Sequence, residues 1–174
     1  VIKDGYKELN GLKVPLRLHQ EDFAQALGIS SKDKYEKVGG GYLAKIFALI
    51  RSHFSNPMED SLKLWKIVVF NYLIGNTDNH IKNISVLYSA DLKSLRLAPA
   101  YDIVSTKLYE SSTDEMSVSI NGKLARSSIL REDFELEAKR CGLGAKIALR
   151  IFDEMKQALP SALAESLAQL REFG

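Results

Sequence analysis

The stretch that most constrains the fold lies between residues 62 and 74, where apolar side chains occupy almost every position. Because they cover almost every side of a helix, this spacing predicts the central core helix. Asp60 or Ser61 is its expected N-cap, and Gly75 its expected end. Other elements have to surround such a helix, so we expect a domain with this helix at its centre.

The remaining periodicity indicates a mainly α fold class with one small β-hairpin. The expected helices cover residues 19–27, 42–54, 132–140, 145–159 and 161–170. Pro160 is the expected boundary between the last two, because proline interrupts a helix interior. The hairpin is expected from strands 84–88 and 95–98, and the stretch to Leu18 is expected to be extended. No linker or repeat divides residues 1–174, which predicts a single domain.

Charge and composition exclude several classes of protein. The 174 residues are 45% apolar, and 24 Lys plus Arg balance 22 Asp plus Glu. A net charge of +2 is too small to predict direct nucleic-acid binding. Every apolar run in the chain is far shorter than the roughly 20 residues of a membrane span. The single Cys141 excludes an internal disulfide and a thiolate zinc site. We therefore expect a cytoplasmic protein without a membrane partner.

A polar cluster directly follows the most apolar helix. Seven of the eight residues from Asn76 to Asn83 are hydrophilic. Asp78 and Asn83 are five positions apart, as are the Asp and Asn of the protein-kinase catalytic loop. A second acid, Asp102, follows the expected hairpin, in the place of the metal-binding Asp of kinases. The spacing predicts that these three oxygen-bearing side chains converge.

Phosphoryl transfer explains why these residue types would be needed. A carboxylate orients the attacking hydroxyl and accepts its proton, a role that fits Asp78. Hard oxygen ligands hold magnesium against the nucleotide phosphates, which fits Asn83 and Asp102. His80 and Lys82 could reach a transferring phosphate. His80 reads equally well as a brace of the loop, and Lys82 as a surface cation.

Longer runs carry a resemblance to a known family. Residues 75–83 read Gly-Asn-Thr-Asp-Asn-His-Ile-Lys-Asn, and residues 97–105 read Leu-Ala-Pro-Ala-Tyr-Asp-Ile-Val-Ser. Upstream, residues 18–28 and 34–36 and the glycines at 39 and 40 agree with the same pattern. Together these runs resemble the catalytic segment of HipA-family serine/threonine kinases, the toxins of bacterial toxin–antitoxin pairs. The likeness covers about residues 17–105.

The resemblance implies a kinase C-lobe-like domain that uses ATP and Mg. It implies Asp78 as the catalytic base, Asn83 and Asp102 as magnesium ligands, and Tyr101 near the nucleotide. It also implies a protein substrate, with aminoacyl-tRNA synthetases as one kind of target, and a HipB-like DNA-binding antitoxin as partner. The chain shows no phosphate-covering glycine loop or ATP-pairing lysine. We therefore expect the N-terminal kinase lobe to be missing, and the chain to be inactive alone.

The same residues allow other functional interpretations. The main alternative is a non-catalytic helical interaction module of a toxin–antitoxin complex. The glycines at 39–41 could bind an anion, although a helix start that needs positive φ is the simpler use. Residues 23–31 resemble the start of a helix-turn-helix, but few apolar anchors follow for a recognition helix. A metal-dependent nuclease using Asp78, His80 and Asn83 would need a further downstream histidine, and none occurs.

Overall fold

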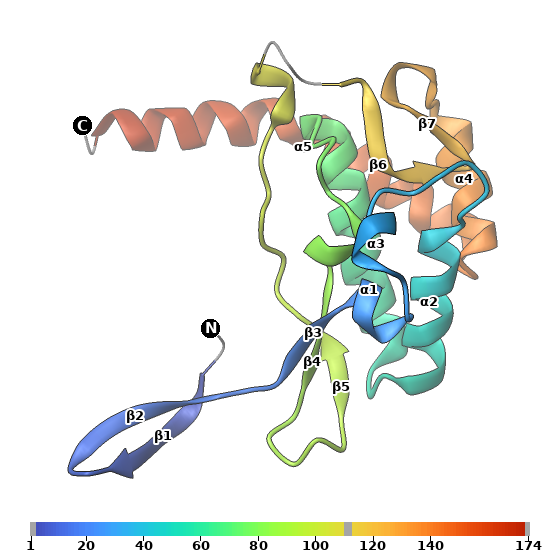
Figure 1. Ribbon diagram of the computed structural model, residues 1–174. Coiled ribbons are helices and arrows are strands. Elements are labelled where there is room, and N and C mark those ends of the chain that lie inside the picture. The colour runs from blue at the N-terminus through green and yellow to red at the C-terminus, as the bar shows by residue number, and fades with distance from the viewer. Residues whose placement is uncertain (1–2, 110–112, 173–174) are drawn as a thin grey trace.

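The computed structural model describes residues 3–109 and 113–172 of the chain (Figure 1). Its helices are α1 (Phe23–Ala26), α2 (Tyr42–His53), α3 (Pro57–Ile74), α4 (Arg131–Arg140) and α5 (Ala145–Glu172). Its strands are β1 (Lys3–Leu9), β2 (Leu12–Arg17), β3 (Gln20–Asp22), β4 (Ser85–Tyr88), β5 (Leu95–Leu97), β6 (Glu115–Ile120) and β7 (Lys123–Ala125). Helices build the centre of the fold, and short antiparallel strands lie around them.

Helix α3 is the central element, as the sequence predicts. Leu64, Trp65 and Val69 are fully buried, and they belong to one hydrophobic cluster that runs from Phe23 to Phe152. The Trp65 indole Nε1 donates a hydrogen bond to the carbonyl of Ala148 in α5 at 3.1 Å. Since α2 and α5 also contact α3, its apolar surface is covered on several sides. The C-terminal end of α3 is therefore a firm base for the loop that follows it.

Two predicted helix boundaries are wrong. Helix α3 begins at Pro57, with Asn56 before it, and not after Asp60 or Ser61. Proline suits the first helical position, because its φ is already helical and no N–H bond is lost there. Helix α5 runs through Pro160 without a break. That part of α5 is exposed, so water can satisfy the carbonyl that the proline ring leaves without a donor.

The predicted hairpin is present, and a third strand joins it. Strands β4 and β5 pair antiparallel, with Val86 opposite Leu97, and β3 pairs with the other edge of β4. The predicted helix over 19–27 is thus wrong in its first half. An Asp22–Gln25 capping box sets the start of α1 at Phe23, where the strand ends.

The structure contains more strands than the one small hairpin that the sequence predicted. The expected extended N-terminal stretch forms the β1–β2 hairpin, which projects from the rest of the fold in Figure 1. Strands β6 and β7 form a hairpin in the region where the sequence predicted no element. In β6 the Ser117 amide N–H donates to the carbonyl of Thr77 at 3.1 Å. The second hairpin therefore lies against the polar loop after α3.

The glycines at 39–41 serve the start of α2. Gly41 is its N-cap with a φ of 61°, and Gly39 has a φ of 85°, so both occupy the left-handed region. After residues 23–31 the chain forms a short 3₁₀ turn at Ser31–Asp33 and no helix before Tyr42. The structure therefore places no recognition helix there. Among the described residues, no helix is both long and apolar enough to cross a membrane.

Candidate active site

Two buried asparagines fix the polar loop at residues 76–83. Gly75 ends α3 with a φ of 71°, and the Asn76 amide N–H donates to the Asn71 carbonyl at 2.8 Å. The Asn76 side-chain Nδ2 donates to Asn71 Oδ1 at 2.7 Å and to the carbonyl of Asp102 at 3.1 Å. Neither asparagine is more than 1% exposed. These bonds join the end of α3 to the segment that carries Asp102.

Two of the three side chains predicted to converge meet, those of Asn83 and Asp102, whereas Asp78 joins them only through its backbone carbonyl. Asn83 Nδ2 donates to the backbone carbonyl of Asp78 at 3.0 Å and to Oδ2 of Asp102 at 2.8 Å. Asp102 has a φ of 56°, which is uncommon for a residue with a side chain and costs roughly 1 kcal/mol or more. The Asp78 carboxylate itself is held elsewhere, because its Oδ1 accepts a hydrogen bond from the Tyr35 hydroxyl at 2.9 Å.

Asn83 and Asp102 suit a magnesium ion that is bound together with phosphates. They place an amide and a carboxylate side by side, and hard oxygen ligands of these types are what Mg²⁺ prefers. No group of three or more His, Cys, Asp or Glu in the described residues could hold a metal by itself. Magnesium in nucleotide sites needs only one or two carboxylates, because water and phosphate oxygens fill the other positions. The two residue types therefore fit the predicted ion, although it is the amide nitrogen of Asn83 that faces Asp102 here, and magnesium binding stays a prediction.

His80 lies beside this group but is buried. The residue is 8% exposed, and its Nε2 lies 3.1 Å from the Nζ of Lys34. Burial of the ring, followed by the nearby Lys34 ammonium, lowers the pKa of the imidazole below its ordinary 6.5. A neutral imidazole that accepts from Lys34 braces the loop. The catalytic role of His80 stays a prediction.

Tyr101 and Lys82 meet each other on the hairpin side of the loop. The Tyr101 hydroxyl donates to the Lys82 carbonyl at 2.7 Å and lies 2.7 Å from the Ser85 hydroxyl oxygen. Burial raises the pKa of the Tyr101 phenol. The Lys82 side chain is half-buried and forms no ion pair with another described residue. Their predicted roles at the nucleotide remain predictions.

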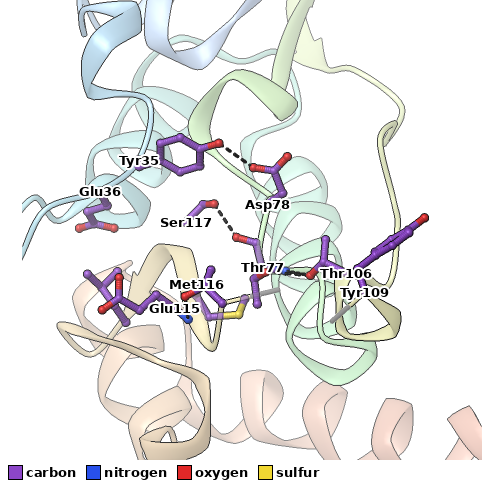
Figure 2. Close-up of a pocket in the computed structure, with 11 residues that line it drawn as sticks. Tyr35, Glu36, Thr77, Asp78, Thr106, Tyr109, Glu115, Met116 and Ser117 are labelled. Carbon is purple, nitrogen blue, oxygen red and sulfur yellow. Dashed lines mark hydrogen bonds between the residues drawn. The ribbon is translucent and has the colours of Figure 1, made fainter. Parts of the chain in front are cut away.

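A cavity of about 420 Å³ opens next to Asp78 (Figure 2). Tyr35 and Thr106 stand on different sides of it, and the Tyr35 ring reaches toward the Asp78 carboxylate. Thr77 is anchored at its floor, since its carbonyl accepts from Ser117 Oγ at 2.6 Å and its amide N–H donates to Thr106 Oγ1 at 3.0 Å. The lining residues are Tyr35, Glu36, Thr77, Asp78, Thr106, Tyr109, Thr113, Glu115, Met116, Ser117 and Leu124.

Sequence reasoning missed the residues that contact Thr77 and Asp78 from outside their own loop. Tyr35 is 43 positions upstream, and Ser117 lies in a strand that was not predicted. The only signal for Tyr35 was its place in the run 34–36, which contributed to the family resemblance. Nothing in local periodicity indicates which distant side chain reaches a loop.

Comparison with known proteins decides the family. A match to the HipA-like C-terminal domain covers residues 6–163. The chain belongs to this family. A Sinorhizobium fredii protein named as a kinase, Y4mE, is 34% identical over 164 residues, covering 94% of this chain and 38% of that protein. The serine/threonine-protein kinase toxin HipA of Shewanella oneidensis is 29% identical over 177 residues, covering 94% of this chain and 40% of that protein.

A solved structure agrees with the family assignment. It is the Shewanella oneidensis toxin–antitoxin complex of HipA, HipB and operator DNA, with a TM-score of 0.81 and 25% identity. The match covers 95% of this chain and 41% of the solved chain. This HipA-like domain therefore spans about two fifths of the relatives that it matches.

Proposed function

We propose that this HipA-like domain carries the catalytic loop of a serine/threonine protein kinase, which transfers the γ-phosphoryl group of MgATP to a protein hydroxyl. The observation that carries the proposal is the amide of Asn83, which touches both the Asp78 carbonyl and the Asp102 carboxylate. The kinase names of the relatives support the same reaction.

In the proposed reaction Asp78 is the general base. Its Oδ1 accepts from Tyr35, and its Oδ2 forms no hydrogen bond with a described residue, so one oxygen remains for the substrate hydroxyl. The hydroxyl oxygen bonds to the γ-phosphorus while the bond to the β-phosphate oxygen breaks and ADP leaves. The hydroxyl proton passes to Asp78. The cavity beside Asp78 gives the acceptor a route to this carboxylate.

Asn83 and Asp102 would hold magnesium, which supplies positive charge against the phosphates when it is bound. Tyr101 and Lys82 are the chain neighbours of Asp102 and Asn83 and are joined by a hydrogen bond, so the nucleotide would lie beside them. His80, through Lys34, keeps the loop in place. The proposed use of ATP also implies a cytoplasmic location.

The proposed partners follow from the relatives. HipA of Shewanella oneidensis was solved with HipB and operator DNA, so we propose a HipB-like DNA-binding protein as the antitoxin of this chain. The proposed substrate is a protein, with an aminoacyl-tRNA synthetase as one candidate. This chain contains no glycine-rich phosphate loop. We therefore propose that an N-terminal kinase lobe completes the site, and that the chain by itself transfers little phosphate.

Transfer of labelled phosphate from γ-³²P-ATP by the full gene product tests this function. Asp78→Asn should lower the rate by about a hundredfold or more, because general-base catalysis contributes on that order. Asp102→Asn and Asn83→Ala should lower it with the ATP concentration held saturating. Asp91→Asn, an identical change in the exposed turn between β4 and β5, serves as the control and should leave the rate unchanged. A wild-type rate in Asp78→Asn would refute the proposal.

The second candidate function is an interaction module without catalysis. The observation that favours it is the end of α5, which projects from the fold in Figure 1. It exposes Leu163, Leu167 and Leu170 by 50% or more, at a spacing that puts them on one face. A joint change of the three leucines to Gln should then abolish binding to a HipB-like protein, whereas Asp78→Asn should leave it intact. If the leucine variant still binds, this face of α5 is not the binding surface for a HipB-like protein.

A further inference from the structure

Three consecutive residues in the segment before α2 join the candidate site to the body of the fold. Lys34, Tyr35 and Glu36 form what we call the 34–36 brace. Lys34 Nζ contacts His80 Nε2 at 3.1 Å, and the Tyr35 hydroxyl donates to Asp78 Oδ1 at 2.9 Å. The Tyr35 and His80 rings also meet edge to face, with centroids 5.5 Å apart. Two members of the brace thus hold the 76–83 loop by its side chains.

Glu36 anchors the brace to the body of the fold. It is 5% exposed, and its two carboxylate oxygens accept from different elements. Oε1 accepts from the Tyr42 amide N–H of α2 at 3.2 Å, and Oε2 from the Ser119 amide N–H of β6 at 2.7 Å. A buried carboxylate is costly unless it is bonded in this way. Gly40 leaves room for it, because a Cβ there would lie 2.7 Å from the Glu36 Cγ.

Strand β6 closes these contacts into a ring. The Glu36 amide N–H donates to the Ser117 carbonyl at 2.9 Å. The Ser117 amide N–H and hydroxyl both donate to the carbonyl of Thr77, at 3.1 and 2.6 Å. Thr77 directly precedes Asp78, and the Asp78 carboxylate accepts a hydrogen bond from Tyr35, a member of the brace. The orientation of Asp78 is therefore set from two directions, along the loop backbone and through its own carboxylate.

The brace contacts the proposed base but not the proposed metal ligands. Its members form no hydrogen bond with Asn83 or Asp102 among the described residues. Tyr35 and Glu36 also form part of the wall of the cavity next to Asp78. A change in the brace should therefore disturb the position of the base while leaving the nucleotide side intact.

We propose that Tyr35 and Glu36 are positioning residues of the phosphoryl transfer. Tyr35 holds the Asp78 carboxylate in its catalytic orientation, and Glu36 fixes Tyr35 by joining the brace to α2 and β6. The catalytic part of this inference rests on the proposed function. The structural role of the brace rests only on the contacts described above.

The kinetic test compares Tyr35→Phe with the wild type in the full gene product. Removing the hydroxyl should lower kcat about tenfold, because a hydrogen bond to a charged group is lost. The KM for MgATP should stay within about twofold, since the brace does not touch Asn83 or Asp102. An unchanged kcat overturns the proposal. Equal rates in the wild type and Asp78→Asn would instead refute the proposed function, and the exchange test below then decides the brace.

Hydrogen exchange of this chain tests the brace without any activity. The His80 and Asn83 amide N–H groups bond within the loop, to the carbonyls of Asp78 and His80 at 2.8 Å each. Their exchange should become about fivefold faster in Tyr35→Phe and in Glu36→Gln. Tyr109→Phe is the matched control, because the hydroxyl that it removes lines the same cavity without contacting Asp78. Exchange of the His80 and Asn83 amides should be unchanged in this variant. Wild-type exchange in Tyr35→Phe overturns the proposal, even where Glu36→Gln fails to fold.

Discussion

At the scale of single residues, carboxamides hold the candidate site together. Asn76 joins α3 to the Asp102 segment, and Asn83 joins Asp102 to the Asp78 backbone. An amide donates and accepts at once and carries no charge to desolvate. Carboxylates in these places would add repulsion next to Asp78 and Asp102. Neutral groups therefore provide the geometry around the two acids.

The buried His80 makes stability depend on pH. Its pKa is lower in the folded chain than the ordinary 6.5, so the unfolded chain binds the proton more readily. The stabilisation is present above pH 6.5 and is lost as the pH falls through the lower folded pKa. We expect the free energy of unfolding, measured with urea, to fall between pH 7 and pH 5. The fall should be smaller in His80→Gln and unchanged in His53→Gln, an exposed histidine. Identical profiles for His80→Gln and the wild type would contradict this assignment.

At the scale of elements, the sequence predicted segments whose own apolar pattern is strong, and not those that form only through tertiary pairing. The buried α3 and the β4–β5 hairpin were evident from apolar spacing. The β6–β7 hairpin also had a signal, because Met116, Val118 and Ile120 alternate and Asn121-Gly122 is a strong hairpin turn. Strand β3 had none, since Gln20–Asp22 is polar and becomes a strand only by pairing with β4.

The same distinction applies to the candidate site. The spacing of Asp78 and Asn83 fixed their proximity locally, and the short hairpin brought Asp102 back to them. Tyr35 could not be predicted, because its contact with Asp78 depends on how Glu36 is held by α2 and β6. Contacts between distant segments are decided by packing of the whole fold, and one sequence carries no direct record of them.

The two halves of α5 should contribute unequally to stability. Its buried residues Ala148, Ile151 and Phe152 all lie in the first half, whereas residues 161–172 are exposed. Deletion of residues 161–174 should therefore change the free energy of unfolding by less than about 0.5 kcal/mol, while the helical circular dichroism signal falls. Ile151→Ala in the first half should cost about 2–5 kcal/mol. A comparable loss on deletion would show that the exposed half packs against the fold in solution.

At the scale of the whole molecule, an aromatic cluster joins helices α3, α4 and α5. The Phe134 ring of α4 lies 6.0 Å from Trp65 and 4.9 Å from Tyr72 of α3, and 4.6 Å from Phe152 of α5, between ring centroids. Tyr72 is three residues before Gly75, where α3 ends and the polar 76–83 loop begins. The loop is thus connected through α3 to the aromatic cluster of the core.

This connection predicts that core and site unfold together. Phe134 is fully buried, so Phe134→Ala should lower the free energy of unfolding by about 3–5 kcal/mol through lost contacts and a cavity. Leu136→Ala, on the same helix but 47% exposed, should cost far less. Trp65 is the only tryptophan of the chain, so its fluorescence reports on the cluster while circular dichroism reports on all helices. The two urea transitions should coincide in each variant, because α3 carries both the cluster and the loop. Separate transitions would mean that the cluster melts independently of the remaining helices, and the site would then rest on local contacts such as the 34–36 brace.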